Sequence, residues 1–208
     1  MRPLIKHLWK TNRKQILERS LENCHARSLH SIMLLESPGS TIRLFFADGS
    51  HTLGRNCPQL IHAQSIGFHA HHCDLTLVPV LGHVFNWLVE VDPEDNDFSA
   101  VLGQYQYSSK ILNGRPGFSK LDERRVRTIS FKELQPEGTH MAASDIHTVY
   151  VDANRRAAWL VFEGKSDPSY EPLCWSGSDL EKFSFEGLYQ PMSELQIESI
   201  LEHCKLLY

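Results

Sequence analysis

The stretch Gly67-Phe-His-Ala-His-His-Cys-Asp-Leu75 places three of the chain's 12 histidines within four consecutive positions. It leads into an apolar, β-branched run that ends at Gly82. Side chains of an extended strand alternate between its two faces, so we expect His69 and His71 on one face and His72 on the other. Two imidazoles on one face supply part of a metal's coordination sphere, and at least one further ligand must come from elsewhere in the chain. The stretch therefore predicts half of a metal site.

The composition is that of an ordinary soluble globular protein, with 208 residues of which 41% are hydrophobic and 22% charged. A chain of this length is long enough to bury roughly 70% of its extended surface in one domain. The net charge of −4 argues against nucleic acid as a partner, because binding phosphates requires a clustered basic surface. No apolar run approaches the roughly 18 residues of a membrane helix, and charges interrupt the N-terminus too often for a signal peptide. We expect a cytoplasmic protein with no membrane partner.

The cysteine pattern points to the same compartment. The five cysteines are an odd number and include no Cys-x-x-Cys pair. This argues against a disulfide framework and against a structural zinc site of the zinc-finger kind. A reducing environment fits this usage best.

Hydrophobic periodicity divides the chain into three parts. Between residues 3 and 35 the apolar positions recur at helical spacings, which predicts two amphipathic helices broken near residues 23–25. We therefore expect a helical segment at 1–36 that packs on a β-barrel at 37–190. Ser193 and Gln196 have the spacing of a capping box, so residues 191–208 should hold a C-terminal helix. Its expected inward residues are Leu195, Ile200, Leu201 and Leu207.

The middle part reads as short strands separated by turns. Its β-branched and aromatic runs lie at 41–47, 61–66, 75–81, 84–91, 125–131, 148–151 and 157–163. Turn residues occupy 92–97 and 113–117, and strands are expected on both sides of each turn. Many short strands with no helix between them predict an antiparallel sandwich or barrel rather than a parallel α/β sheet.

These motifs resemble those of the cupins, a superfamily of small β-barrel metalloproteins. The first cupin motif runs His-x-His, three or four residues, Glu, six residues, Gly, and here His69, His71, Leu75 and Gly82 keep that spacing with Leu75 in place of Glu. The second motif runs Pro-x-Gly-x-x-His, and Ala142-Ala-Ser-Asp-Ile-His147 aligns with it without the Pro and Gly. The resemblance covers about residues 40–165 and implies a mainly β fold: a single cupin-type, jelly-roll-like antiparallel barrel, with helices at both ends. It also implies His147 as the third metal ligand.

The replacement of Glu by Leu75 leaves three neutral imidazoles. This ligand set is similar to that of the thiol dioxygenase branch of the cupins, such as cysteine dioxygenase, which implies one Fe(II) per chain, with Zn, Ni or Mn as alternatives. In that branch an arginine holds the substrate carboxylate, which implies Arg43 in this role. Bidentate binding of a carboxylate by guanidinium is the physical reason for an arginine. Tyr105 and Tyr150 fit either barrel packing or a hydrogen bond to a bound oxygen species.

Several residues near these histidines have more than one interpretation. Cys73 reads either as a small packed hydrophobe or as a thiol near the metal. His72 and Asp74 are expected on the opposite face, at the surface or orienting a ligating histidine, unless a bulge turns one inward. His62 and His140 are further candidates for the pocket.

Three functions fit this sequence. The first is a non-haem Fe(II) dioxygenase that acts with dioxygen on a small-molecule substrate such as a thiol. The second is a metal-dependent cupin without oxygen chemistry, an isomerase or lyase whose metal polarises a carbonyl. The third is a non-catalytic cupin that binds a small ligand. A homodimer is expected from family analogy alone.

Overall fold

The computed structural model describes residues 1–51, 53, 67–91, 99–112, 115–167, 169, 171–182 and 186–207. The helices of this described part are α1 (Arg2–Thr11), α2 (Arg13–Arg19) and α3 (Glu194–His203). None of them is long and apolar enough to cross a membrane. The strands are β1 (Leu21–Glu22), β2 (Leu29–Ser37), β3 (Ser40–Ala47), β4 (Phe68–His69), β5 (Leu75–Leu81), β6 (Phe85–Val91), β7 (Ala100–Leu112), β8 (Arg115–Glu133), β9 (Thr139–Met141), β10 (Ile146–Tyr150), β11 (Ala157–Glu163), β12 (Leu173–Ser176) and β13 (Gln190–Pro191).

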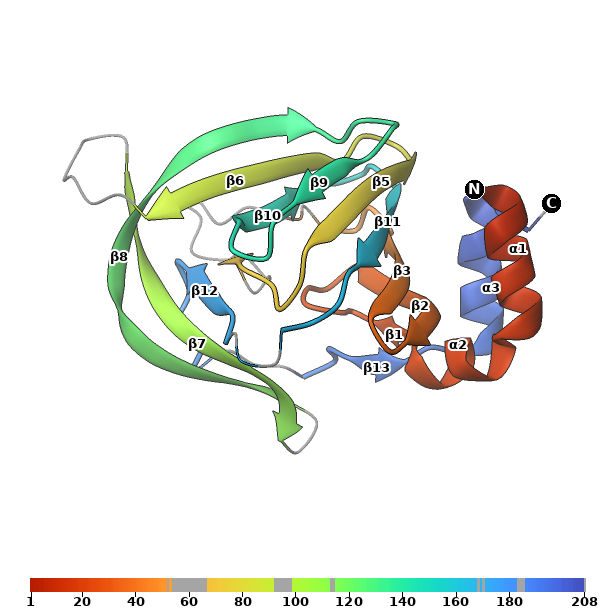
Figure 1. Cartoon of the computed structure of the whole chain (residues 1–208), viewed down its shortest axis with the longest axis horizontal. Helices are drawn as coiled ribbons and strands as arrows, with labels where there is room; N and C mark the ends of the chain where they lie inside the picture. Colours follow the sequence, from red (N-terminus) through yellow and green to blue (C-terminus); the bar gives the residue numbers. More distant parts are fainter. Residues whose placement is uncertain are drawn as a thin grey trace.

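The strands form two antiparallel sets. A seven-stranded sheet runs in the order β13-β1-β2-β3-β11-β5-β9, and the strands β10-β4-β12-β7-β8-β6 close on themselves as a barrel. Figure 1 shows the long, curved strands β6, β7 and β8 on the side of the molecule away from the helices. The mainly β, antiparallel fold with helices at both ends, expected from the sequence, is confirmed.

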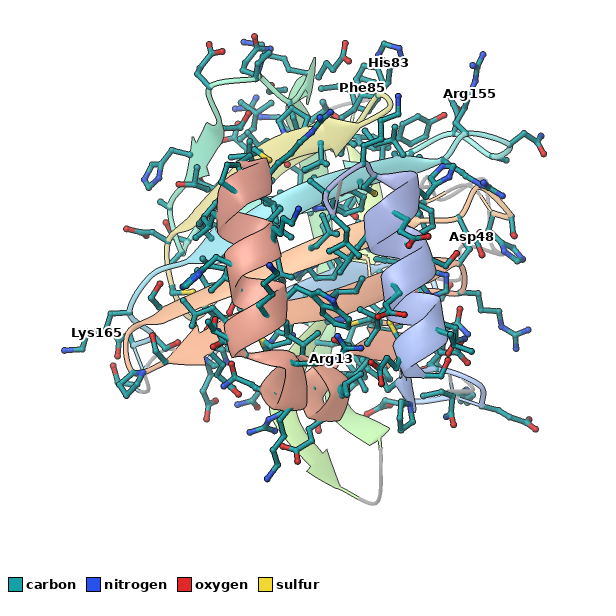
Figure 2. All side chains as sticks on the ribbon, turned by 90° about the vertical axis from the view of Figure 1, so that its right-hand side faces the viewer. Arg13, Asp48, His83, Phe85, Arg155 and Lys165 are labelled. Carbon is teal, nitrogen blue, oxygen red and sulfur yellow. The ribbon has the colours of Figure 1, made fainter. Side chains whose placement is uncertain are left out.

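Both faces of the seven-stranded sheet are covered, and alternate side chains along its strands point to one face or the other. On β3, Leu44 packs toward the helices, whereas Phe45 faces the interior of the molecule. On β11, Leu160 and Trp159 divide in the same way. Because successive side chains of a strand point to opposite faces, alternate residues of β3 and β11 face inward, and those that line the interior cavity are Arg43, Phe45, Trp159, Val161 and Glu163. Figures 1 and 2 show α1 and α3 side by side across the other face.

Arg13 joins the two ends of the chain. Its guanidinium lies over the Trp9 ring, 4.6 Å from the ring centroid, and forms ion pairs with Glu194 and Glu198 of α3. The pair with Glu198 spans 3.0 Å, and Figure 2 shows Arg13 where α1 and α2 meet. The N-terminal and C-terminal helices therefore pack as one layer on the sheet.

The prediction of a helix after residues 23–25 is wrong. The helical region breaks at Asn12 rather than near residues 23–25, and Leu29–Ser37 is the strand β2. This strand is buried on both faces: Ile32 and Leu34 pack with the helices, and Leu29 packs inside. A strand that is buried on both faces carries an apolar run without alternation, and such a run cannot be told from a buried helix by periodicity. The sheet therefore begins before residue 37.

Most of the other predicted elements are confirmed. Strands β3, β5, β6, β10 and β11 coincide with predicted runs to within a few residues, and β8 contains the run at 125–131. β7 and β8 pair as an antiparallel hairpin with Leu112 opposite Arg115, so residues 115–117 of the predicted turn belong to β8, whereas residues 113–114 lie outside the described part of the chain. The strand predicted at 61–66 and the turn at 92–97 lie outside the described residues.

The C-terminal helix begins with the predicted capping box. The Ser193 hydroxyl accepts a hydrogen bond from the Gln196 backbone, and the Gln196 side chain accepts one from the backbone of Ser193. Ile200 and Leu201 are buried as expected. Leu195 is wrongly predicted to face inward, since it is 78% exposed and Ile197 fills the core position instead.

Gly82 closes the turn after β5, and its substitution should be costly. Its φ is +68°, and a Cβ at this position would lie 2.4 Å from the backbone oxygen of Arg156. Gly39 also has a positive φ, +86°, but a Cβ there would meet nothing within 4 Å. We expect Gly39→Ala to lower the free energy of unfolding by about 1 kcal/mol and Gly82→Ala by about 3 kcal/mol, because only the second adds a backbone clash. Urea denaturation of both variants checks this, and equal losses would contradict it.

Candidate metal centre

Three histidines from distant parts of the chain meet at one point. His69 is the last residue of β4, and the antiparallel pairing of β4 with β10 places His147 directly opposite it. The His71 backbone N–H donates to the Ala143 carbonyl at 2.9 Å, which holds His71 beside the same two strands. One ring nitrogen from each histidine lies within 4.8 Å of the other two. The convergence of His69, His71 and His147, which the family resemblance implies, is thus present in the fold.

Hydrogen bonds on the far side of two rings fix their tautomers. His69 Nδ1 lies 3.1 Å from the Gly67 carbonyl oxygen, which can only accept, so Nδ1 carries the proton and Nε2 keeps its lone pair. His147 Nδ1 lies 2.7 Å from Asn86 Oδ1, while the Asn86 amide group donates to Met141 Sδ. His147 Nδ1 is therefore also the donor. Both histidines present an unprotonated Nε2, the form that binds a metal.

The spacing and charge of the cluster fit a metal ion. His71 Nε2 and His147 Nε2 are 2.8 Å apart, close to the roughly 2.9 Å between two nitrogens bound at right angles to one ion at about 2.0–2.1 Å. Burial lowers the pKa of His69 below its usual value and the pKa values of His71 and His147 well below theirs. The imidazoles are therefore neutral at physiological pH, as ligands must be. Among the described residues, these three histidines supply a donor set of three nitrogens.

The cluster lies in the wall of an interior cavity of about 360 Å³ between the two sets of strands. Most of the wall is apolar and includes Leu29, Leu53, Leu77, Val149, Trp159 and Val161. Leu75 lines the cavity at the position where the motif has Glu, and it is buried. The space is of the size that holds a small molecule.

Arg43 lies in this cavity wall, where the alternation of β3 places it. Its Nε donates to Glu163 Oε1 at 3.0 Å, and both side chains line the cavity about one-quarter exposed, at 25% and 27%. The ion pair occupies one edge of the guanidinium and leaves its other donors for a ligand. The role of Arg43 in binding a carboxylate stays a prediction.

The two predicted tyrosines lie elsewhere. Tyr105, on β7, is buried, and its hydroxyl donates to the Ser178 carbonyl at 3.1 Å. Tyr150, at the end of β10, donates to the Asp152 carboxylate and packs against Phe85 and Phe131. Neither belongs to the side chains that line the cavity in the described part of the chain. Their hydroxyls are bound to groups outside the histidine cluster.

His72 differs from its expected place. The strand β4 ends at His69 and the chain bends at residues 72 and 73, so strand alternation does not continue through His72. As a result His71 and His72 both line the cavity. Cys73 packs in the core behind them, where burial raises the pKa of its thiol, as the packing interpretation expects.

The other open candidates do not join the cluster. Asp74 is exposed, and its Oδ1 accepts from the Ala143 backbone at 2.9 Å, which fixes the turn that His71 also contacts. His140 is exposed on β9 and is not one of the cavity residues that the structure describes. His62 lies outside the described residues.

Sequence reasoning missed two polar residues at this site. Asn86 is a buried polar residue of strand β6, and it orients His147. Its only sequence signal is a polar side chain at a core-facing strand position. His25 lines the cavity from the segment between β1 and β2, with its ring centroid 6.1 Å from that of His69. Burial, with smaller contributions from His69 and Arg43, lowers the pKa of His25 to about 3.

Comparison with known proteins gives only distant structural similarity. No family model and no curated protein matches the chain. Among solved structures it is similar to a cupin domain from Bordetella pertussis Tohama I, with 13% identity over 67% of this chain and 95% of that one and a TM-score of 0.32. A cupin superfamily protein from Desulfitobacterium hafniense DCB-2 shows 14% identity over 69% and 96%, with a TM-score of 0.32. The polyketide cyclase RemF from Streptomyces resistomycificus shows 8% identity over 72% and 75%, with a TM-score of 0.36.

Proposed function

We propose that this chain is a cupin-type, metal-dependent enzyme: a non-haem Fe(II) dioxygenase that acts on a small substrate such as a thiol. The observation that carries the proposal is the meeting of three neutral imidazoles at the wall of a mostly apolar cavity, with Leu75 where a carboxylate ligand would stand. Three protein ligands leave coordination positions of the ion open, which distinguishes a catalytic metal site from a closed structural one.

The protein's own groups have distinct tasks in this proposal. His69, His71 and His147 would hold the ion, and Asn86 and the Gly67 carbonyl keep two of these rings in the ligating tautomer. Bound Fe(II) would supply the redox chemistry between substrate and dioxygen. Arg43 is the proposed contact for a substrate carboxylate, and the apolar wall keeps water away from the substrate. For a thiol, both oxygen atoms of dioxygen add to sulfur to give a sulfinic acid, so sulfur loses four electrons and dioxygen gains four.

Oxygen uptake by the iron-loaded protein tests this proposal. We expect protein loaded anaerobically with Fe(II) to consume one dioxygen per sulfinic acid formed from at least one member of a thiol panel, on the order of 1 to 10 turnovers per second. The matched control is the same protein loaded with Zn(II), which binds imidazole and has no redox chemistry. Uptake no faster than that of free iron would reject the oxygenase.

The metal found in protein purified without added ions separates the remaining functions. Tightly bound zinc with no oxygen uptake would favour a non-oxidative isomerase or lyase. Retained small-ligand binding without any metal would favour a non-catalytic binding protein. Iron at one equivalent per chain is the expected result.

A further inference from the structure

Two chain segments that lie outside the barrel strands meet at the cavity and form a clasp, defined here as residues 23–28 and 187–190. Asn23 connects the two segments by hydrogen bonds. The Asn23 side-chain amide donates to the Gly187 carbonyl at 3.0 Å, and the Asn23 backbone carbonyl accepts from the Tyr189 N–H at 3.2 Å. Asn23 Oδ1 also accepts from the Ser28 backbone at 2.9 Å. The clasp therefore fixes two segments more than 160 residues apart in sequence.

The backbone of the clasp is strained at the residues that face the cavity. His25 has φ +68° and Tyr189 has φ +55°, both in the left-handed region. Such angles are uncommon for residues other than glycine, although histidine adopts them more often than most. Strain of this kind lowers the population of a conformer by a factor on the order of a few to a hundred. It persists where the surrounding structure holds it, often at functional sites. Here it brings the His25 and Tyr189 side chains together in the cavity wall.

The His25 ring is held from several sides. Its Nδ1 lies 3.2 Å from the Tyr189 hydroxyl, and the two rings meet edge to face. Phe45 stacks beside it with the ring centroids 6.4 Å apart, and Phe45 in turn stacks on Trp159. The bond to Tyr189 occupies Nδ1 and leaves Nε2 for a molecule in the cavity. The imidazole is thus oriented before any ligand arrives, which lowers the entropic cost of binding.

We propose that His25 is a specificity-determining residue, whose imidazole hydrogen-bonds a polar group of the substrate while the other end of that substrate binds the metal. Tyr189 and Asn23 are the residues that position it. This inference rests on the proposed metal centre, because the distance from His25 to the histidine cluster sets the length of the substrate.

The surroundings define the chemical class of that substrate. The Tyr189 hydroxyl occupies Nδ1 of His25, which leaves one ring nitrogen for a ligand. A hydroxyl suits either tautomer of the ring, because it can donate to that nitrogen or accept from it, so a hydroxyl is the group that we expect to meet His25. Apart from these polar groups the cavity wall is largely apolar and includes Leu29, Leu53 and Leu75. A short aliphatic chain with a metal-binding group at one end and a hydroxyl at the other fits this cavity.

Matched pairs of thiols test the proposal by binding alone. The protein is loaded with Co(II), and the thiolate-to-cobalt absorption band is titrated with 2-mercaptoethanol against 1-propanethiol, 3-mercapto-1-propanol against 1-butanethiol, and 4-mercapto-1-butanol against 1-pentanethiol. Each pair has the same length and differs only in a terminal hydroxyl or methyl group. The hydroxyl preference is the Kd of the methyl thiol divided by the Kd of the hydroxyl thiol of the same length. At one of the three lengths, we expect this ratio to be roughly fivefold larger in the unmodified protein than in His25→Phe, which is the effect of one neutral hydrogen bond. His25→Gln should retain part of the preference, and Tyr189→Phe should weaken it.

The outcomes separate this inference from the metal centre itself. Cobalt content and the cobalt d–d spectrum are measured for every variant. An equal hydroxyl preference in the unmodified protein and in His25→Phe, at all three lengths, would overturn the role of His25 and leave the metal site standing. Loss of cobalt from a folded His25→Phe protein would also overturn it, since His25 would then be a ligand. Failure of the unmodified protein to bind cobalt would instead overturn the proposed function.

Discussion

Replacement of His147 by alanine is expected to remove metal binding. The change takes away one of three nitrogen ligands and leaves Asn86 Oδ1 buried without the donor that it has in the native protein. Loss of a residue that merely orients a ligand costs about 10- to 100-fold in metal affinity, so loss of a ligand should cost more than about 100-fold. Metal content after dialysis, and competition with a chromogenic chelator, measure the effect.

His140→Ala is the matched control for this experiment. His140 is an exposed histidine on β9, seven residues before His147 in sequence, and it is not part of the described cavity wall. The control should retain full metal content. Because His147 is buried, His71→Ala serves as a second test at a less buried position, and circular dichroism reports whether each variant is folded. A folded His147→Ala or His71→Ala protein that keeps one tightly bound metal would contradict the assignment.

The meeting of the histidines is predicted through the family resemblance, because spacing along the chain does not show which distant strands pair. In the structure β4 pairs with β10, and His69 lies directly opposite His147. The strand β11 is predicted from local pattern alone, since it follows a turn and all of its residues except Glu163 are apolar. Here local pattern and final structure agree, as is expected when each level of a sequence favours the same fold.

The failures at β2 and His25 have a common physical cause, which is contact with segments distant in sequence. The apolar run in the first part of β2 is predicted as helix because helices from both ends of the chain cover one face of that strand, so apolar residues occupy both faces and the run has no strand alternation. Tyr105 and Tyr150 were candidates by residue type, but their hydroxyls bond to groups outside the cavity. His25 was missed because a clasp with residues 187–190 brings it inward, and no local pattern records a contact across that separation.

Leu75 is the residue whose substitution should change the metal site most instructively. It is 3% exposed, lines the same cavity as the histidines, and pairs with Glu163 across the sheet. Leu75→Glu would place a carboxylate there, beside an existing one. Without metal we expect this variant to lose about 3–5 kcal/mol of stability, because an uncompensated charge is buried.

With metal present, the same Leu75→Glu carboxylate should become a fourth ligand and recover much of the lost stability. The control is Leu75→Gln, which has the same shape and also loses the leucine packing, but carries no charge. We expect Zn(II) or Fe(II) to bind the Glu variant at least about tenfold more tightly than the Gln variant, since an added anionic oxygen ligand offsets the charge of the ion. Thermal unfolding with and without metal, together with chelator competition, gives both quantities. Equal metal affinities for the two variants would show that residue 75 does not reach the ion, and the all-histidine site would then owe nothing to the leucine at this position.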